Sequence, residues 1–244
     1  MSFVSPYIYY SYQKTKNLRF WGKMCHYVFG MNKLIIAIFA AGVLFVGSVF
    51  GSGVIDRPVP FLCQAPYGDW RQPWQDGCEE AAIIMAMSWV EGKAVTKRSG
   101  NQTILDLVKF QIKNYGGHFD LTAKQSAKLI KDYYQYDGIE VLQAGTSQEL
   151  KKFLAAGDLI IAPMAGRELG NPYFTPPGPY YHYVLIKGYD DTRGVFITND
   201  PGTRRGANYT YKYRTLFQAI HDWTGRKESI SRGKKSILVI KLDQ

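Results

Sequence analysis

Hydrophobic and polar residues change their spacing along the chain, and this change divides the chain into three regions. Residues 34–55 form an apolar run without a single charged residue. Between residues 78 and 157 the apolar residues recur with helical spacing, whereas after residue 158 they alternate or cluster in short runs typical of strands. The pattern therefore predicts an apolar N-terminal segment, a helical region and a sheet, in that order.

The helical region contains four segments, and the last two have recognisable starts. Leu121 and Thr122 form the apolar-then-capping pattern that precedes a helix, and Thr146 with Glu149 forms the pattern of a capping box. Gly157 is placed to end the fourth segment. The predicted helices cover residues 78–90, 103–113, 122–134 and 146–157.

The strand region contains four segments with strand spacing and one further helical segment. The predicted strands cover residues 158–163, 181–189, 194–198 and 236–242, and the predicted helix covers residues 214–223. Helices followed by an antiparallel sheet are typical of an α+β fold. We therefore expect N-terminal helices packed on an antiparallel sheet, in one domain that spans residues 58–244.

The apolar run at residues 34–55 is long enough to cross a membrane. As a helix, its 22 residues would extend ~33 Å, against ~30 Å for the hydrocarbon core of a bilayer. Residues 1–33 form a basic tail with no acidic residue, which the positive-inside rule places in the cytoplasm. We expect a transmembrane anchor in the cytoplasmic membrane of a prokaryote, with the residues from Asp56 onward outside.

A cleaved signal peptide is the alternative for the same run. Translation from Met31 would give Lys33 followed by an apolar stretch, and the small residues at 51–53 would offer a cleavage site. Residues 1–33 would then be a mis-assigned start, and the body would be secreted. Both interpretations place the body outside the cytoplasm.

Charge and cysteine content exclude several classes of protein. The net charge is +10, but five of the 30 basic residues lie in residues 1–55, where there is no acidic residue. The remaining chain carries 25 basic against 20 acidic residues without a long basic stripe, so we expect no nucleic-acid partner. Three cysteines, with no CxxC pair, indicate neither a disulfide scaffold nor a zinc site, and we expect no metal or cofactor.

Cys78 lies where a nucleophilic thiol is expected. A turn ending in Gly77 delivers it to the first turn of a helix, where unpaired backbone N–H groups and the helix dipole favour the thiolate. Glu79 and Glu80 follow directly, and acidic residues in the first turn cap the same dipole and oppose thiolate formation. Another group must therefore help to ionise Cys78.

His182 is the candidate for that group. It lies in an alternating segment on the same face as Val184 and Ile186, and a turn at residues 190–193 leads into the next strand. A hairpin centred on Asp191 would place Asp200 directly opposite His182, within reach of a hydrogen bond. A register shift of one residue would offer Asn199 instead. Cys, His and Asp are the nucleophile, base and orienting group of a thiol hydrolase.

These segments resemble the papain-like cysteine peptidases related to the bacteriocin-processing, double-glycine-cleaving peptidases (C39-like). Four separated motifs carry the resemblance in the same order along roughly residues 58–205. They are VPFLCQAP at residues 59–66 with Trp70, GCEEAA at 77–82, HYVLIKGYD at 182–190 and NDPG at 199–202.

The resemblance implies a papain-like fold, a peptide substrate and a catalytic triad of Cys78, His182 and Asp200. It also implies that Gln64, the glutamine after the Val-Pro segment, completes the oxyanion hole. Gln72 and Gln75 are nearer to the cysteine in sequence and remain rivals for that role.

Three other interpretations stay open. Cys63 and Cys78 could form a disulfide in an exported protein, which would remove the thiol. The chain could be a catalytically silent cell-surface module that binds peptides or glycopeptides. The same three residues could also serve a thiol amidase or acyltransferase acting on cell-wall peptides.

Overall fold

Seven strands form one antiparallel sheet in the computed structural model, which describes residues 53–242. The strand order is β2-β7-β3-β4-β5-β6, and β1 pairs with β4 beside this path. The strands are β1 (Val54–Asp56), β2 (Ile139–Gln143), β3 (Leu159–Ala165), β4 (Tyr181–Asp190), β5 (Val195–Asn199), β6 (Tyr209–Lys212) and β7 (Ser236–Ile240).

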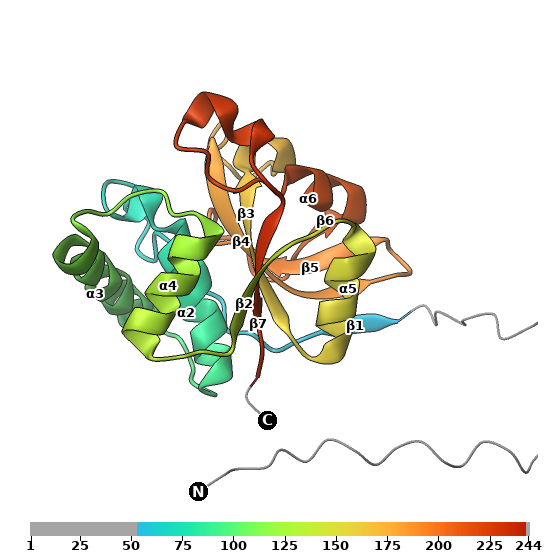
Figure 1. The fold of residues 1–244 in the computed structure, drawn as a ribbon, viewed down its shortest axis with the longest axis horizontal. Helices are drawn as coiled ribbons and strands as arrows, with labels where there is room; N and C mark the ends of the chain where they lie inside the picture. Colours follow the sequence, from blue (N-terminus) through green and yellow to red (C-terminus); the bar gives the residue numbers. More distant parts are fainter. Residues whose placement is uncertain (1–52, 243–244) are drawn as a thin grey trace, which may run out of the picture. The chain divides into compact units, whose positions relative to one another are not determined.

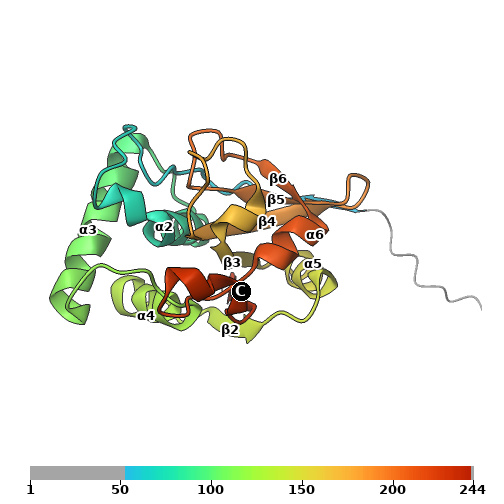
Figure 2. The ribbon, with the colours of Figure 1, turned by 90° about the horizontal axis from the view of Figure 1, so that it is seen from above.

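Helices cover both faces of this sheet (Figure 1). The α-helices are α2 (Cys78–Val90), α3 (Lys97–Tyr115), α4 (Ala123–Tyr134), α5 (Ser147–Ala156) and α6 (Tyr213–Ala219), and the 3-10 turns are η1 (Trp74–Asp76), η2 (Gly166–Leu169) and η3 (Lys227–Arg232). Figures 1 and 2 show α2, α3 and α4 on one side of the sheet and α5 and α6 on the other. The sheet was predicted to be covered by the N-terminal helices; the second helical layer was not foreseen.

Alternate residues of the central strands pack into two separate hydrophobic cores, one on each face of the sheet. Leu159 and Ile161 of β3 pack with α2, α3 and α4, whereas Ile160 and Ala162 pack with α5 and α6. All seven residues of β3 are buried, as are the first nine of β4. A strand covered on both faces has an apolar run instead of an alternating pattern, because neither set of side chains meets water.

Most predicted elements are confirmed, with shifted ends. Helix α2 matches the prediction at both ends, and α4 begins after Thr122, whose hydroxyl accepts a hydrogen bond from the Gln125 N–H. Helix α3 begins six residues earlier than predicted, at Lys97, because Thr96 forms its capping box. The last predicted helix is shorter than expected and ends at Ala219. Strands β1, β2 and β6 were not predicted.

Strand β1 lies where the apolar run meets the folded body. Val54 and Ile55, assigned from sequence to the apolar segment, pair with Asp190 and Tyr189 of β4. The folded body therefore begins before residue 58, and the last two residues of the apolar run belong to its sheet. Residues 34–52 of that segment, the basic tail and Met31 lie outside the described residues. Within residues 53–242, no helix is long and apolar enough to span a membrane.

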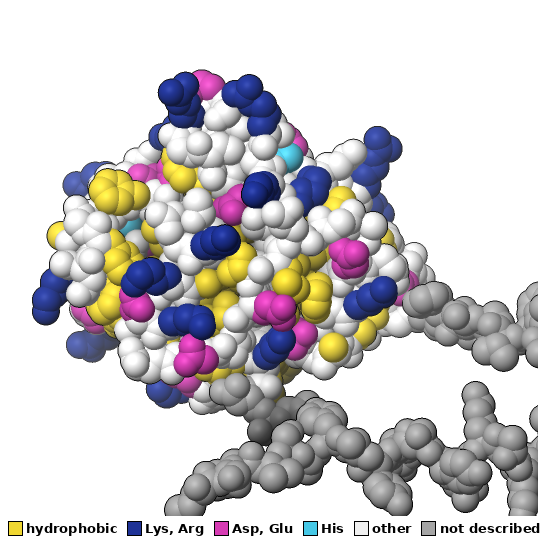
Figure 3. All heavy atoms as spheres, in the orientation of Figure 1, with side chains coloured by type: hydrophobic (Ala, Val, Ile, Leu, Met, Phe, Trp, Pro, Cys, Tyr) yellow, Lys and Arg dark blue, Asp and Glu magenta, His cyan; other side chains and the backbone are white. Residues whose placement is uncertain are grey.

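Acidic and basic side chains are interspersed on the face of the molecule that Figure 3 shows. The absence of a nucleic-acid partner stays a prediction.

Candidate active site

Cys78 is the first residue of α2 and Gly77 is the residue before the helix, as the sequence predicts. The Cys78 side chain is buried. Cys78 lines a cavity of about 850 Å³ that is also lined by Gln64, Trp70, Phe174 and His182. Cys63 is a separate buried thiol, and both cysteines are free in the structure.

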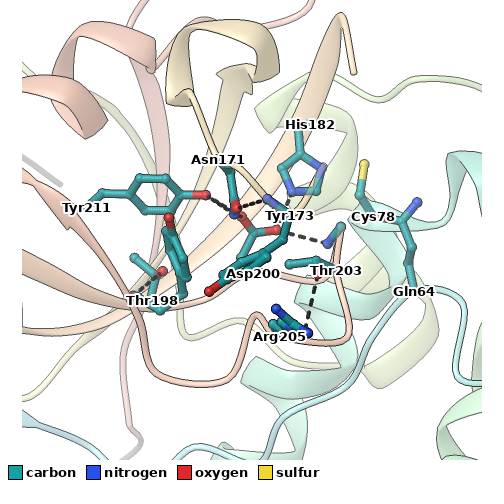
Figure 4. Close-up of polar contacts among 12 residues, drawn as sticks. Gln64, Cys78, Asn171, Tyr173, His182, Thr198, Asp200, Thr203, Arg205 and Tyr211 are labelled. Carbon is teal, nitrogen blue, oxygen red and sulfur yellow. Dashed lines mark hydrogen bonds and ion pairs between the residues drawn. The ribbon is translucent and has the colours of Figure 1, made fainter. Parts of the chain in front are cut away.

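His182 and Asp200 form a buried hydrogen-bonded pair. The distance from His182 Nε2 to Asp200 Oδ1 is 2.7 Å, and the two side chains are 2% and 0% exposed. Figure 4 shows Cys78 and Asp200 on different sides of the imidazole ring. Because Nε2 contacts Asp200, Nδ1 is the ring nitrogen left for the thiol.

The strand register behind this pair differs from the predicted one. Asn199 faces Leu185 and Thr198 faces Ile186, so Asp200, one residue past the end of β5, continues toward Val184 and not toward His182. His182 lies two residues before Val184 in β4, and its side chain is on the same face of the sheet. The carboxylate therefore reaches it diagonally across the hairpin, a distance that side chains can span.

Asn199, the predicted alternative to Asp200, points away from the imidazole. Its Nδ2 donates hydrogen bonds to the carbonyl oxygens of Val59 and Pro60 at 3.1 and 3.3 Å, and its Oδ1 accepts one from the Asn208 N–H. Asn199 thus fastens the segment before the cavity to the sheet.

Four donors surround the Asp200 carboxylate. In addition to His182, the Gly202 N–H donates to Oδ1 at 2.9 Å, and Asn171 Nδ2 and the Tyr211 hydroxyl donate to Oδ2. Burial opposes ionisation of Asp200, but His182 and these hydrogen bonds together hold its pKa below the ordinary value for a carboxyl. The residue is therefore ionised at neutral pH.

Sequence reasoning missed the role of Asn171 and Tyr211. Tyr211 lies on β6, whose four residues are too few for a clear alternating pattern, although Tyr209 and Tyr211 share the spacing of a strand face. Asn171 lies in an aromatic, proline-rich segment between η2 and β4, where no helix or strand pattern marks it. Phe174 of that segment packs edge-on against the His182 ring, with ring centroids 5.3 Å apart.

The three glutamines considered for the oxyanion hole occupy different positions. Gln64 lines the cavity beside Cys78, but its Nε2 donates to the carbonyl oxygens of Trp74 and Gln75, at 3.0 and 2.9 Å. Both amide hydrogens of Gln64 are thus engaged. Gln75 also lines the cavity, whereas Gln72 is exposed and bonds to Asp76 outside it. The assignment of Gln64 to the oxyanion hole stays a prediction.

Glu79 and Glu80 lie in the first turn of α2, as the sequence predicts, but their side chains do not face solvent. Both side chains are 1% exposed. Burial raises the pKa of the Cys78 thiol well above its ordinary value. The resting sulfur therefore carries a proton, and a base has to accept it before the sulfur can attack.

The cavity wall is aromatic and basic. Arg204 and Arg205 line it next to Tyr173, and the Arg205 guanidinium lies 4.9 Å from the centroid of the Tyr173 ring. Among the described residues, neither arginine has a carboxylate within 4.0 Å. The described part of the chain also has no cluster of three His, Cys, Asp or Glu side chains that could hold a metal ion.

Comparisons with known proteins show which family the chain belongs to. A protein from Bacillus anthracis described as a C39-like peptidase is 18% identical, with a TM-score of 0.51 over 79% of this chain and 100% of that chain. Xylellain, a cysteine protease from Xylella fastidiosa, is 15% identical, with a TM-score of 0.36 over 78% of this chain and 86% of its own. No curated protein matches the sequence. The model of the Peptidase_C39 like family matches residues 57–230, and the chain therefore belongs to this family.

Proposed function

We propose that the protein is a cysteine peptidase that hydrolyses peptide bonds with Cys78, His182 and Asp200. The buried His182–Asp200 pair beside a helix-start cysteine is the observation that carries the proposal. An ionised carboxylate on Nε2 fixes the imidazole tautomer that leaves Nδ1 unprotonated and able to act as a base. A histidine with only a structural role would not need a cavity beside its free nitrogen.

The reaction follows from these positions. The Cys78 sulfur attacks the carbonyl carbon of the peptide while its proton passes to His182 Nδ1, and the negative charge develops on the carbonyl oxygen. The unpaired N–H groups at the start of α2 face that charge. The imidazolium then protonates the leaving amine as the carbon–nitrogen bond breaks. A water molecule, deprotonated by His182, hydrolyses the resulting thioester and restores the thiol.

We also propose that this reaction takes place outside the cytoplasm, with the body anchored by the apolar run that precedes β1 or released after its cleavage. Protease added to intact spheroplasts should digest the body, and a body that stays protected until lysis would refute this location.

The peptidase proposal is tested with the full chain and a mixture of synthetic peptides of varied sequence. Mass spectrometry should detect newly formed peptide ends with the wild type, and Cys78→Ala should form none. Iodoacetamide should alkylate Cys78 faster than Cys63, because Cys78 lines the cavity together with His182 and Cys63 does not. His182→Ala should remove this difference.

The outcomes separate the alternatives. Fast alkylation of Cys78 without peptide cleavage would exclude general peptidase activity and would point to the amidase or acyltransferase alternative. Equal alkylation of Cys63 and Cys78 in the wild type would favour a silent binding module.

A further inference from the structure

Glu79 contacts the sulfur that the proposed function makes the nucleophile. Its Oε2 lies 2.9 Å from Cys78 Sγ, and its Oε1 accepts a hydrogen bond from the Leu121 N–H at 3.1 Å. The side chain is 1% exposed. Each oxygen of this buried carboxyl therefore has a partner: Oε1 contacts the backbone before α4, and Oε2 contacts the thiol.

The surroundings of Glu79 favour its neutral form. No cationic side chain among the described residues lies within 4.0 Å of it. The titratable groups that influence it are Cys78, Glu80 and Asp120, together with the Tyr181 and Tyr183 phenols of β4. Burial, and then the charge of Glu80, raise the pKa of Glu79 well above its ordinary value.

Glu80, the next residue, has a different environment. Its Oε1 lies 3.2 Å from His118 Nε2 and accepts a hydrogen bond from the Gln111 side-chain amide. Two adjacent buried carboxyls do not both ionise readily. The one with the histidine and amide partners is Glu80, which leaves the proton on Glu79.

We propose that Glu79 is a neutral carboxylic acid whose Oε2–H donates a hydrogen bond to the Cys78 thiolate and stabilises it for attack. This inference rests on the proposed function, because it assigns a further catalytic group to the same nucleophile. It resolves a conflict in the sequence: two acidic residues follow the cysteine, yet an ionised carboxylate at 2.9 Å would repel a thiolate.

The protons balance without another reactant. Before attack, Cys78 and Glu79 each carry one proton and His182 carries one, on Nε2 toward Asp200. The thiol proton passes to His182 Nδ1, and the Glu79 proton stays on Oε2 and now points at the negatively charged sulfur. When the sulfur becomes a thioester, Glu79 remains neutral and is ready for the next turnover.

Alkylation of Cys78 by iodoacetamide, measured as a function of pH, tests this role. Glu79→Gln keeps an N–H donor that cannot ionise, whereas Glu79→Leu has no donor. A hydrogen bond to a charged group corresponds to about 10- to 100-fold in the thiolate population. We expect Glu79→Leu to slow alkylation by about this factor and Glu79→Gln to stay close to the wild type.

Two results would overturn the proposal. If Glu79→Gln reacts about tenfold faster than the wild type, the native carboxyl is ionised and inhibits the thiol. If Glu79→Leu reacts as fast as the wild type, the carboxyl does not stabilise the thiolate.

Infrared spectroscopy provides a test that does not need the leucine variant to fold. The wild type at neutral pH should show the C=O stretching band of a protonated, buried carboxylic acid, and this band should be missing from Glu79→Gln. Asp158→Asn, which removes a carboxyl that does not influence Glu79, is the control in which the band should persist. A wild type without the band would refute a neutral Glu79.

His182→Ala separates this inference from the peptidase proposal. If His182→Ala leaves the alkylation rate unchanged, the proposal that His182 activates Cys78 is wrong, whatever the infrared band shows. If His182→Ala slows alkylation and the band is absent, only the role of Glu79 fails.

Discussion

Gly202 is the position where a single methyl group should disable the site. A Cβ on Gly202 would lie 2.8 Å from His182 Cε1 and 2.9 Å from Phe174 Cε1. Carbon atoms in contact prefer about 3.5–4.0 Å, so Gly202→Ala lacks nearly 1 Å on two sides at once. The backbone of Gly202 is not in the left-handed region, so alanine is not excluded by conformation.

The methyl group has to move the imidazole, because Phe174 blocks the other direction. A displacement of about 1 Å at a reacting group lowers the rate by about 10²-fold. Overpacking of a filled site also lowers the free energy of unfolding by about 1–3 kcal/mol. We therefore expect Gly202→Ala to fold with a lowered melting temperature and to lose about 10²-fold in kcat/KM for peptide cleavage, and a comparable factor in alkylation of Cys78.

Gly145→Ala is the matched control, because the nearest atom to its new Cβ is a flexible Glu149 carboxylate oxygen at 3.3 Å. It should retain wild-type kcat/KM. If Gly202→Ala is folded and keeps kcat/KM within about threefold of the wild type, the imidazole is not held against Gly202 and the steric reasoning is wrong.

Four further predictions concern residues of the same site. Asp200→Asn should lower kcat by up to about 10⁴-fold with little change in KM, since the orienting group acts on the transition state; a large change in KM alone would contradict this. The lowered pKa of Asp200 contributes stability above about pH 4 that is lost as pH falls through the folded-state value, so Asp200→Asn should flatten the acid limb of the melting-temperature profile. Gln64→Ala should lower both kcat and the melting temperature. If Gln75 supplies the oxyanion donor, Gln75→Ala should lower kcat and leave the melting temperature unchanged. Steady-state kinetics combined with thermal unfolding distinguishes these two outcomes. Arg204→Ala with Arg205→Ala should raise KM for acidic peptides by about 2- to 5-fold per arginine and leave neutral peptides unchanged; equal effects on both peptide sets would exclude charge recognition.

Sequence patterns locate well those elements whose ends are marked by a capping or terminating residue. Thr122 caps α4 and Gly157 ends α5 because a hydroxyl and a positive φ angle satisfy helix ends through neighbouring residues alone. Strand β1 has only three residues, and its place depends on β4, more than 130 residues away in sequence. The same limit applies to β6, which carries Tyr211 to Asp200. Such contacts are set by tertiary pairing and leave little mark on the local sequence.

The burial of Glu79 could not be predicted from the sequence for a related reason. A carboxyl in the first turn of a helix ordinarily faces water and caps the dipole. Here the ten residues from Cys78 to Met87 are all buried, because α2 lies between the sheet and the other N-terminal helices. The apolar residues after Glu80 suggest a helix with one buried face, and no local pattern distinguishes that from a helix buried all round.

His182 and Asp200 lie on the same face of the sheet because a β-bulge shifts the register between β4 and β5. Near the turn, Tyr189 faces Phe196 and Asp190 faces Val195. If that pairing continued unchanged, Asp200 would face residue 185 and would lie on the opposite side of the sheet from His182. The register shifts by one residue between Ile186 and Gly188, which restores Asp200 to the face of His182.

The residue inserted by the bulge is held from the other edge of β4. Lys187 is 2% exposed, pairs with Asp56 of β1, and donates to the Arg57 carbonyl oxygen at 3.0 Å. Gly188 has no side chain because a Cβ there would overlap the Ile55 carbonyl group of β1. Strand β1 thus fixes the bulge, and the bulge sets which face of the sheet Asp200 occupies. Periodicity along β4 and β5 alone cannot reveal this, since the deciding contact comes from the segment that immediately follows the N-terminal apolar run.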